Sequence, residues 1–168
     1  TNSGASGVSG MLVFSSGTAV KGNSGSILIG TGAATDGRGG LVAISAGSGT
    51  SGVGGLVSIL SGRSTVHTGG ALSITSGEGT ATSSGVVTIR SANSGASGVS
   101  GSLVFSSGTS LKGNSGNLMI GTGAATDGRG GLVAISAGSG TSGAGGLVSI
   151  LSGRSTVHTG GALSITSG

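Results

Sequence analysis

The chain has 168 residues, of which 42 are glycine, and it contains no cysteine, proline, tryptophan or tyrosine. Only 6% of the residues are charged, and the formal net charge of +4 is spread thinly, which excludes the clustered basic face of a nucleic-acid-binding protein. The absence of cysteine excludes disulfides and thiolate metal sites, and no apolar run reaches the roughly eighteen residues of a membrane-spanning helix.

A large apolar residue recurs every fifteen residues, with one spacing of sixteen between Ile89 and Phe105. If this residue is numbered position 4 of each unit, position 2 is always aliphatic, position 6 always small and position 15 always glycine. Side chains alternate along a strand, so positions 2, 4 and 6 share one face and predict one strand per unit. The position-4 residues, expected to form the core ladder, are Phe14, Ile29, Ile44, Ile59, Ile74, Ile89, Phe105, Ile120, Ile135, Ile150 and Ile165.

After each predicted strand, the sequence indicates a return path. A glycine at position 7, such as Gly17, predicts a sharp corner with positive φ, and β-branched residues at position 10, such as Val20, predict a short opposing strand. The fold class expected is therefore all-β, a flattened two-sided β-solenoid of about eleven fifteen-residue coils. With strands about 4.8 Å apart, six coils would rise about 29 Å. The sixteen-residue unit around 91–101 predicts either a bulge or a larger corner.

A second, longer period lies above the first. Residues 93–168 repeat residues 2–77 at an offset of 91 and differ at seven positions. We therefore expect residues 1–168 to form a single continuous solenoid segment, with a super-repeat at 1–91 and a partial second copy at 92–168, belonging to a longer repetitive protein. No capping coil is recognisable, so open strand edges are expected to dock end to end.

Charged residues occupy matching positions in successive units. Lys21 and Asp36 both stand at position 11, and Arg63 and Glu78 both stand at position 8. In stacked coils, each couple would form an inter-coil charge pair. An exposed ion pair contributes only about 0–1 kcal/mol, so these pairs are interpreted as markers of register.

Motifs typical of enzymes occur without the context they need. Gly47–Gly52 and Gly138–Gly143 match G-x-G-x-x-G, but a strand is expected to follow each, where the dinucleotide motif requires a helix. Ser64 and His67 could act with Asp36 as a hydrolytic triad only if they met in a pocket, and the predicted coils separate them. One aspartate per super-repeat cannot supply the roughly six to eight oxygens of a calcium site. No catalytic, cofactor-binding or metal site is expected, and the chain is not expected to be an enzyme.

Segments such as Gly-Gly-Leu-Val-Ser-Ile-Leu-Ser-Gly at 54–62 resemble tandem-repeat β-solenoid proteins rich in glycine, serine and threonine, of the extracellular fibre and adhesin type. The resemblance implies an extracellular or cell-surface location and a structural role without an active site. We therefore expect a segment of a fibril or surface appendage that associates with itself end to end or laterally. Outward serines and threonines are expected to be able to carry O-linked sugar.

A binding module for ice or glycan is the alternative. Some ice-binding solenoids also have fifteen-residue coils, with a flat face of Thr-x-Thr. In this chain single threonines align at position 10, but the partner column is irregular, and Lys21 and Arg90 interrupt the outward columns. The aligned threonines are Thr35, Thr50, Thr65 and Thr80.

Overall fold

The computed structural model describes residues 7–167. Within this part of the chain the backbone forms neither helices nor strands; it is extended and is interrupted by bends at regular intervals. The prediction of an all-β solenoid is therefore wrong, and so is the prediction of a long strand facing a short one in each unit. Alternation of side chains requires only an extended backbone, whereas a strand also requires a hydrogen-bonded neighbour.

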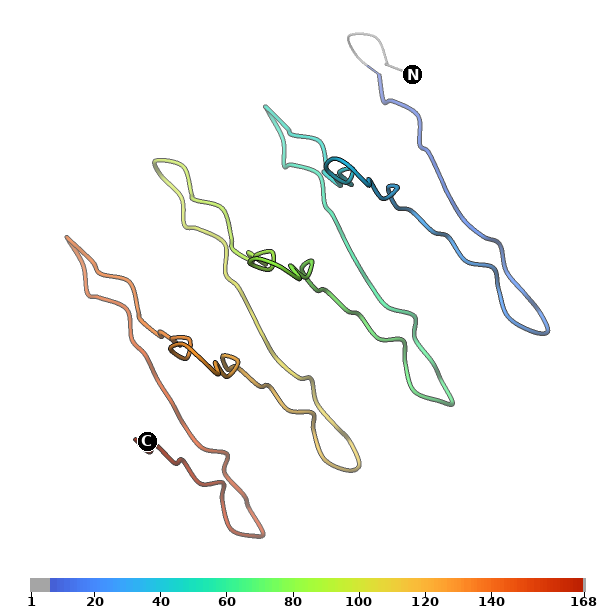
Figure 1. The fold of residues 1–168 in the computed structure, drawn as a ribbon. Helices are drawn as coiled ribbons and strands as arrows, with labels where there is room; N and C mark the ends of the chain where they lie inside the picture. The colour runs from blue at the N-terminus through green and yellow to red at the C-terminus, as the bar shows by residue number, and fades with distance from the viewer. Residues whose placement is uncertain (1–6, 168) are drawn as a thin grey trace. The chain divides into compact units, whose positions relative to one another are not determined.

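The bends stand at positions 10–12 of the fifteen-residue units and reverse the direction of the chain (Figure 1). Each unit therefore consists of an extended stretch at positions 1–6, here named the linking segment, and a hairpin at positions 7–15. The bends occupy 20–22, 35–37, 50–52, 65–67, 80–82, 96–98, 111–113, 126–128, 141–143 and 156–158.

In the described part of the chain, a backbone hydrogen bond closes the base of five hairpins. The N–H of the position-15 glycine donates to the carbonyl of the position-7 residue in the same unit. These bonds pair backbone N–H and C=O groups of the same unit, whereas a solenoid needs such bonds between successive coils. The five bonds run from Gly55 to Gly47 (2.8 Å), Gly70 to Gly62 (2.8 Å), Gly85 to Gly77 (2.9 Å), Gly146 to Gly138 (2.8 Å) and Gly161 to Gly153 (2.8 Å).

The small residue at position 6 lies directly against the glycine at position 15. A Cβ atom added to Gly55 would stand 3.0 Å from the Cβ of Ala46, and one added to Gly40 would stand 2.8 Å from the Cβ of Thr31. Ordinary Cβ contacts are longer than this, so any larger residue at position 15 would push the hairpin limbs apart. The close approach of positions 6 and 15 thus explains why position 6 is always small and why position 15 is always glycine.

Two hairpins are closed by a threonine side chain. The hydroxyl of Thr31, at position 6, donates to the carbonyl of Gly40 over 3.1 Å, and Thr122 donates to Gly131 over 3.3 Å. The same hairpin design recurs at an offset of 91, because the two stretches share their sequence.

Among residues 7–167, positive φ is confined to one hairpin of each repeat. Gly17 and Gly22 have φ values of 81° and 96°, and Gly108 and Gly113 have values of 78° and 103°. The prediction that position-7 glycines supply positive φ is therefore correct for Gly17. It is wrong for Gly32, Gly47, Gly62 and Gly77, whose φ values are not positive.

The sixteen-residue unit has its extra residue in the hairpin. The chain turns tightly at Ala96 and Ser97, where the N–H of Gly98 lies 3.5 Å from the carbonyl oxygen of Gly95. Of the two alternatives that the sequence left open, the larger corner is the one observed.

The chain divides into two units, Thr1–Val87 and Thr88–Gly168. Within the first, successive hairpins leave in different directions, and the hairpins at 17–25 and 62–70 leave in the same one (Figure 1). Within the second, the hairpins at 108–116 and 153–161 are related in the same way (Figure 1). A direction therefore recurs at every third hairpin, which is a longer structural period than one coil of a fifteen-residue solenoid.

Candidate self-association surface

The linking segments carry most of the large apolar side chains, and they leave them exposed. No hydrophobic side chain of the described residues is buried. The position-4 residues that were expected to form a core ladder are between 56% exposed, at Ile89, and 81% exposed, at Ile165. A single chain therefore leaves most of the surface of these side chains uncovered.

Successive side chains of the linking segments nevertheless alternate in their exposure, as the sequence predicts. Large residues at position 1, such as Leu41, are 84% to 88% exposed, whereas those at position 2 from Ile27 onward are 44% to 58% exposed. Val42 (48%) and Val133 (47%) are the equivalent position-2 residues of the two sequence repeats. Positions 1 and 2 thus face opposite sides, and position 2 faces the side that the chain partly covers.

The accessible surface of the whole chain shows how incomplete this cover is. The chain exposes 16614 Å². For a mass of 15.1 kDa, a folded monomer would expose roughly 7,100 Å² and an extended chain roughly 22,000 Å². The chain alone therefore lies closer to an extended chain than to a folded domain.

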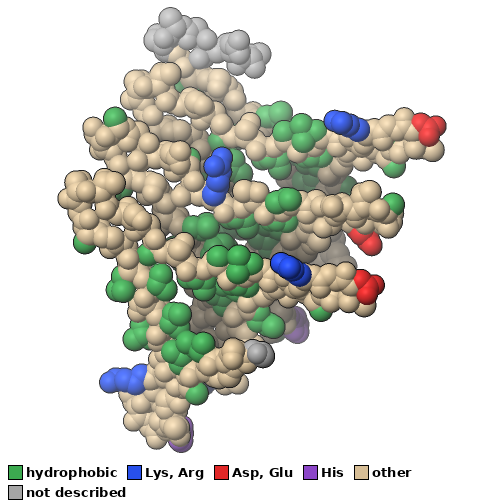
Figure 2. All heavy atoms as spheres, turned by 60° about the vertical axis from the view of Figure 1, so that its left-hand side comes forward, with side chains coloured by type: hydrophobic (Ala, Val, Ile, Leu, Met, Phe, Trp, Pro, Cys, Tyr) green, Lys and Arg blue, Asp and Glu red, His purple; other side chains and the backbone are tan. Residues whose placement is uncertain are grey.

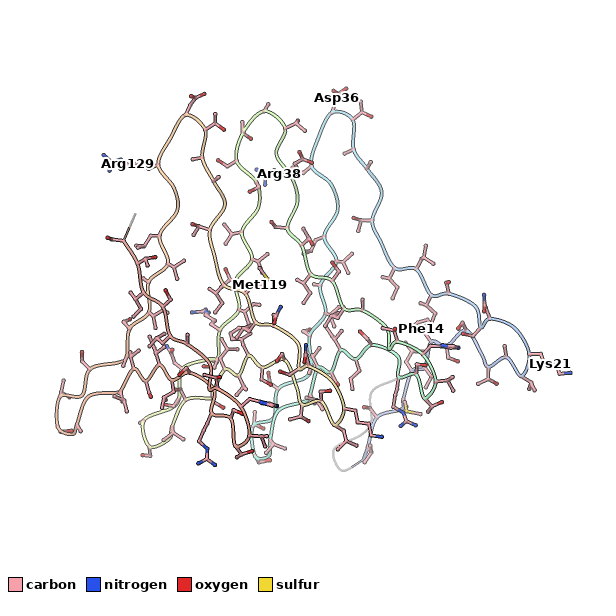
Figure 3. The ribbon with its side chains drawn as sticks, turned by 90° about the horizontal axis from the view of Figure 1, so that it is seen from below. Phe14, Lys21, Asp36, Arg38, Met119 and Arg129 are labelled. Atoms are coloured by element: carbon pink, nitrogen blue, oxygen red, sulfur yellow. The ribbon has the colours of Figure 1, made fainter. Side chains whose placement is uncertain are left out.

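Charge is separated from the apolar linking segments. Among the described residues every Asp, Glu, Lys, Arg and His except Arg90 belongs to a hairpin. Lys21 and Asp36 lie at hairpin tips, whereas Phe14 lies on a linking segment (Figure 3). The space-filling view shows the same separation, with charged side chains mostly on the projecting segments and apolar ones gathered nearer the bases of these segments (Figure 2).

The residues predicted to form inter-coil charge pairs belong to separate hairpins. Lys21 and Asp36 occupy the tips of successive hairpins that leave in different directions, so the structure does not bring these two side chains together (Figure 3). Arg63 and Glu78 each follow the glycine that closes the base of their own hairpin. The solenoid register that these pairs were expected to mark is not present.

Ser64 and His67 meet, but in a structural arrangement. The hydroxyl oxygen of Ser64 accepts the backbone N–H of His67 over 2.9 Å and lies 3.4 Å from the backbone N of Val66. The second repeat has the same pair, with 2.8 Å between the Ser155 hydroxyl and the His158 N–H. The imidazole takes no part, so each serine holds a bend as in other turns with serine or threonine.

Each of the two G-x-G-x-x-G segments runs from the base of a hairpin to its tip. A Cβ added to Gly49 would stand 2.7 Å from the carbonyl oxygen of Gly52, and one added to Gly140 would stand 2.6 Å from that of Gly143. These glycines therefore permit the close approach of two hairpin limbs, and no helix follows either segment. Glycine at position 9, which recurs in both repeats, is the sequence signal for these tight tips.

The threonines considered for ice binding lie at bends. Thr35 and Thr50 each begin the bend of a hairpin, and these successive hairpins leave in different directions (Figure 1). In the part of the chain that the structure describes, no pocket is found and no three His, Cys, Asp or Glu residues are grouped to hold a metal ion. The regular surface of linking segments is thus the most prominent candidate for a function.

Comparisons with protein-family models, with curated proteins and with solved structures found no match to this chain. Among the described residues there is no helix of the length and apolarity that crossing a bilayer demands. The function is therefore inferred from the hairpins and linking segments themselves.

Proposed function

We propose that this chain is a structural segment of an extracellular fibre or surface appendage, and that it acts by associating with itself, without catalysis. One observation carries the proposal: the same hairpin recurs every fifteen residues, with an exposed apolar linking segment between one hairpin and the next. A surface that repeats at a fixed interval can bind a partner of the same period at many points. Weak contacts then add up along the chain.

The composition supports the extracellular part of the proposal. Glycine, serine and threonine predominate and charged residues are 6%, as in the secreted repeat proteins that the sequence resembles. The described serines and threonines are almost all exposed, which suits them to carry O-linked sugar outside the cell. A mechanical role needs length and regularity, and the near-identical repeats at an offset of 91 provide both.

The test is electron microscopy of the purified chain, together with sedimentation velocity, as the protein concentration is raised. We expect a growing population of filaments of uniform width, because each linking segment offers large apolar side chains at positions 2 and 4. A chain that stays monomeric over the whole range would contradict the proposal. A monomer that produced thermal hysteresis or selectively captured a glycan would indicate the binding-module alternative.

A further inference from the structure

We propose that a second copy of this chain binds along the linking segments, and that the charged hairpin tips remain in solvent. This inference rests on the self-association of the proposed function and assigns it to one surface. The surface consists of positions 1–6 of each unit: 11–16, 26–31, 41–46, 56–61, 71–76, 86–91, 102–107, 117–122, 132–137, 147–152 and 162–167.

The first argument is the area available for binding. The 16614 Å² that the chain exposes exceeds the surface of a folded monomer of its mass by roughly 9,500 Å². A stable interface between two proteins buries roughly 1,600 Å² in total. Covering only a fraction of the linking segments would therefore be enough to hold two copies together.

The second argument is that the backbone of the linking segments makes no hydrogen bonds to other backbone groups of the described residues. None of the backbone–backbone hydrogen bonds that join described residues involves a linking segment; they close hairpins or, at Gly98, a turn. Extended backbone with this pattern presents a row of N–H and C=O groups, which is a template for pairing with another chain. A second copy can thus supply apolar cover and hydrogen-bonding partners together.

The third argument selects the partner. A protein that covers successive linking segments must present apolar groups at the same fifteen-residue interval, and another copy of this chain does so by construction. The two sequence repeats also preserve positions 2 and 4 of this surface, where the change from Ile27 to Leu118 is the only difference, whereas positions 1 and 3 differ at three residues. A contact that the first repeat makes through positions 2 and 4 is therefore open to the second.

Charge excludes the hairpin tips from this interface. Copies that met tip to tip in register would place Lys21 against Lys21 and Asp36 against Asp36, and like charges directly opposite one another are destabilising. The linking segments carry a single charged residue, Arg90, among the described residues. Association along them therefore buries little charge.

The test compares two double variants of the full chain by sedimentation equilibrium. Val42→Asp with Val133→Asp places two carboxylates on the linking segments, at equivalent positions of the two repeats. Val66→Asp with Val157→Asp places the same two charges at hairpin tips, where both valines are 81% exposed. We expect the first variant to raise the dissociation constant of self-association by at least about tenfold per valine, and the second to leave it within about threefold of the wild type.

A check on folding accompanies this comparison. Amide exchange at the Gly55 and Gly146 N–H groups reports whether the hairpins next to Val42 and Val133 remain closed. Val42→Thr with Val133→Thr, which keeps the shape of the side chain and adds a hydroxyl, is the milder variant, and it should weaken association while leaving both glycines protected. If the threonine variant associates as the wild type does, the proposed surface is wrong.

The outcomes separate this inference from the proposed function. If the wild type forms only closed dimers, and the double variant with Val42→Asp abolishes them, the proposed surface is correct and the proposed fibre is wrong. If filaments form and both aspartate variants assemble as well as the wild type does, the proposed fibre is correct and the proposed surface is wrong. Stronger weakening by the tip variant would also overturn the surface.

Discussion

Glycine at position 15 is the residue on which the hairpin most depends. Its N–H closes the hairpin base, and its lack of a Cβ lets the position-6 side chain lie against it, as Ala46 does against Gly55. The constancy of this glycine and the small size of position 6 are visible in the sequence. Their connection is not, because the two residues are nine apart and only the bend between them brings them together.

Replacing Gly55 with alanine should open one hairpin. The new Cβ would stand 3.0 Å from the Cβ of Ala46 and 3.3 Å from the backbone N of Gly47, so the limbs must separate and the closing hydrogen bond is lost. A net hydrogen bond contributes about 1 kcal/mol, which corresponds to roughly fivefold faster amide exchange at residue 55. Exchange measured by NMR checks this.

The matched control is Gly47→Ala. A Cβ at Gly47 meets nothing within 4 Å, and its φ is not positive, so the alanine should fit and the Gly55 N–H should keep its protection. Equal loss of protection in both variants would show that the close approach of positions 6 and 15 does not determine the hairpin.

The hairpin as an element is closed in more than one way. Five hairpins use a backbone hydrogen bond, two use a threonine hydroxyl, and those at 17–25 and 108–116 contain two positive-φ glycines each. The sequence period predicts that an element of some kind repeats every fifteen residues. It does not predict strands correctly, because the backbone hydrogen bonds of five units are local, between glycines at positions 7 and 15, and none joins successive units in the described part of the chain.

Ser64→Ala should loosen one bend and leave its copy unchanged. The variant removes the oxygen that accepts the His67 N–H, and the loss of a comparable serine cap costs about 1 kcal/mol. The amide of His67 should then exchange roughly fivefold faster. His158, which Ser155 holds in the same way, is the control within the same molecule. Unchanged exchange at His67 would show that the hydroxyl does not stabilise the bend.

At the scale of the whole chain, two features of the sequence correspond to the structure and one does not. The near-identity of 2–77 with 93–168 yields the same hairpin closures at an offset of 91, as at Gly55 and Gly146. The alternation of positions 1 and 2 appears in their exposure. The predicted core of position-4 residues does not appear. The pattern of side chains determines which side of the chain is apolar, whereas the distance between units depends on what covers that side.

Amide hydrogen exchange, measured residue by residue at a concentration where the chain sediments as a monomer, tests most directly whether each unit closes on itself. We expect slow exchange at the N–H groups of Gly55, Gly70, Gly85, Gly146 and Gly161, and fast exchange along the linking segments between them. Slow exchange throughout the linking segments of the monomer would contradict this, because it would show that successive units pair with one another within a single chain.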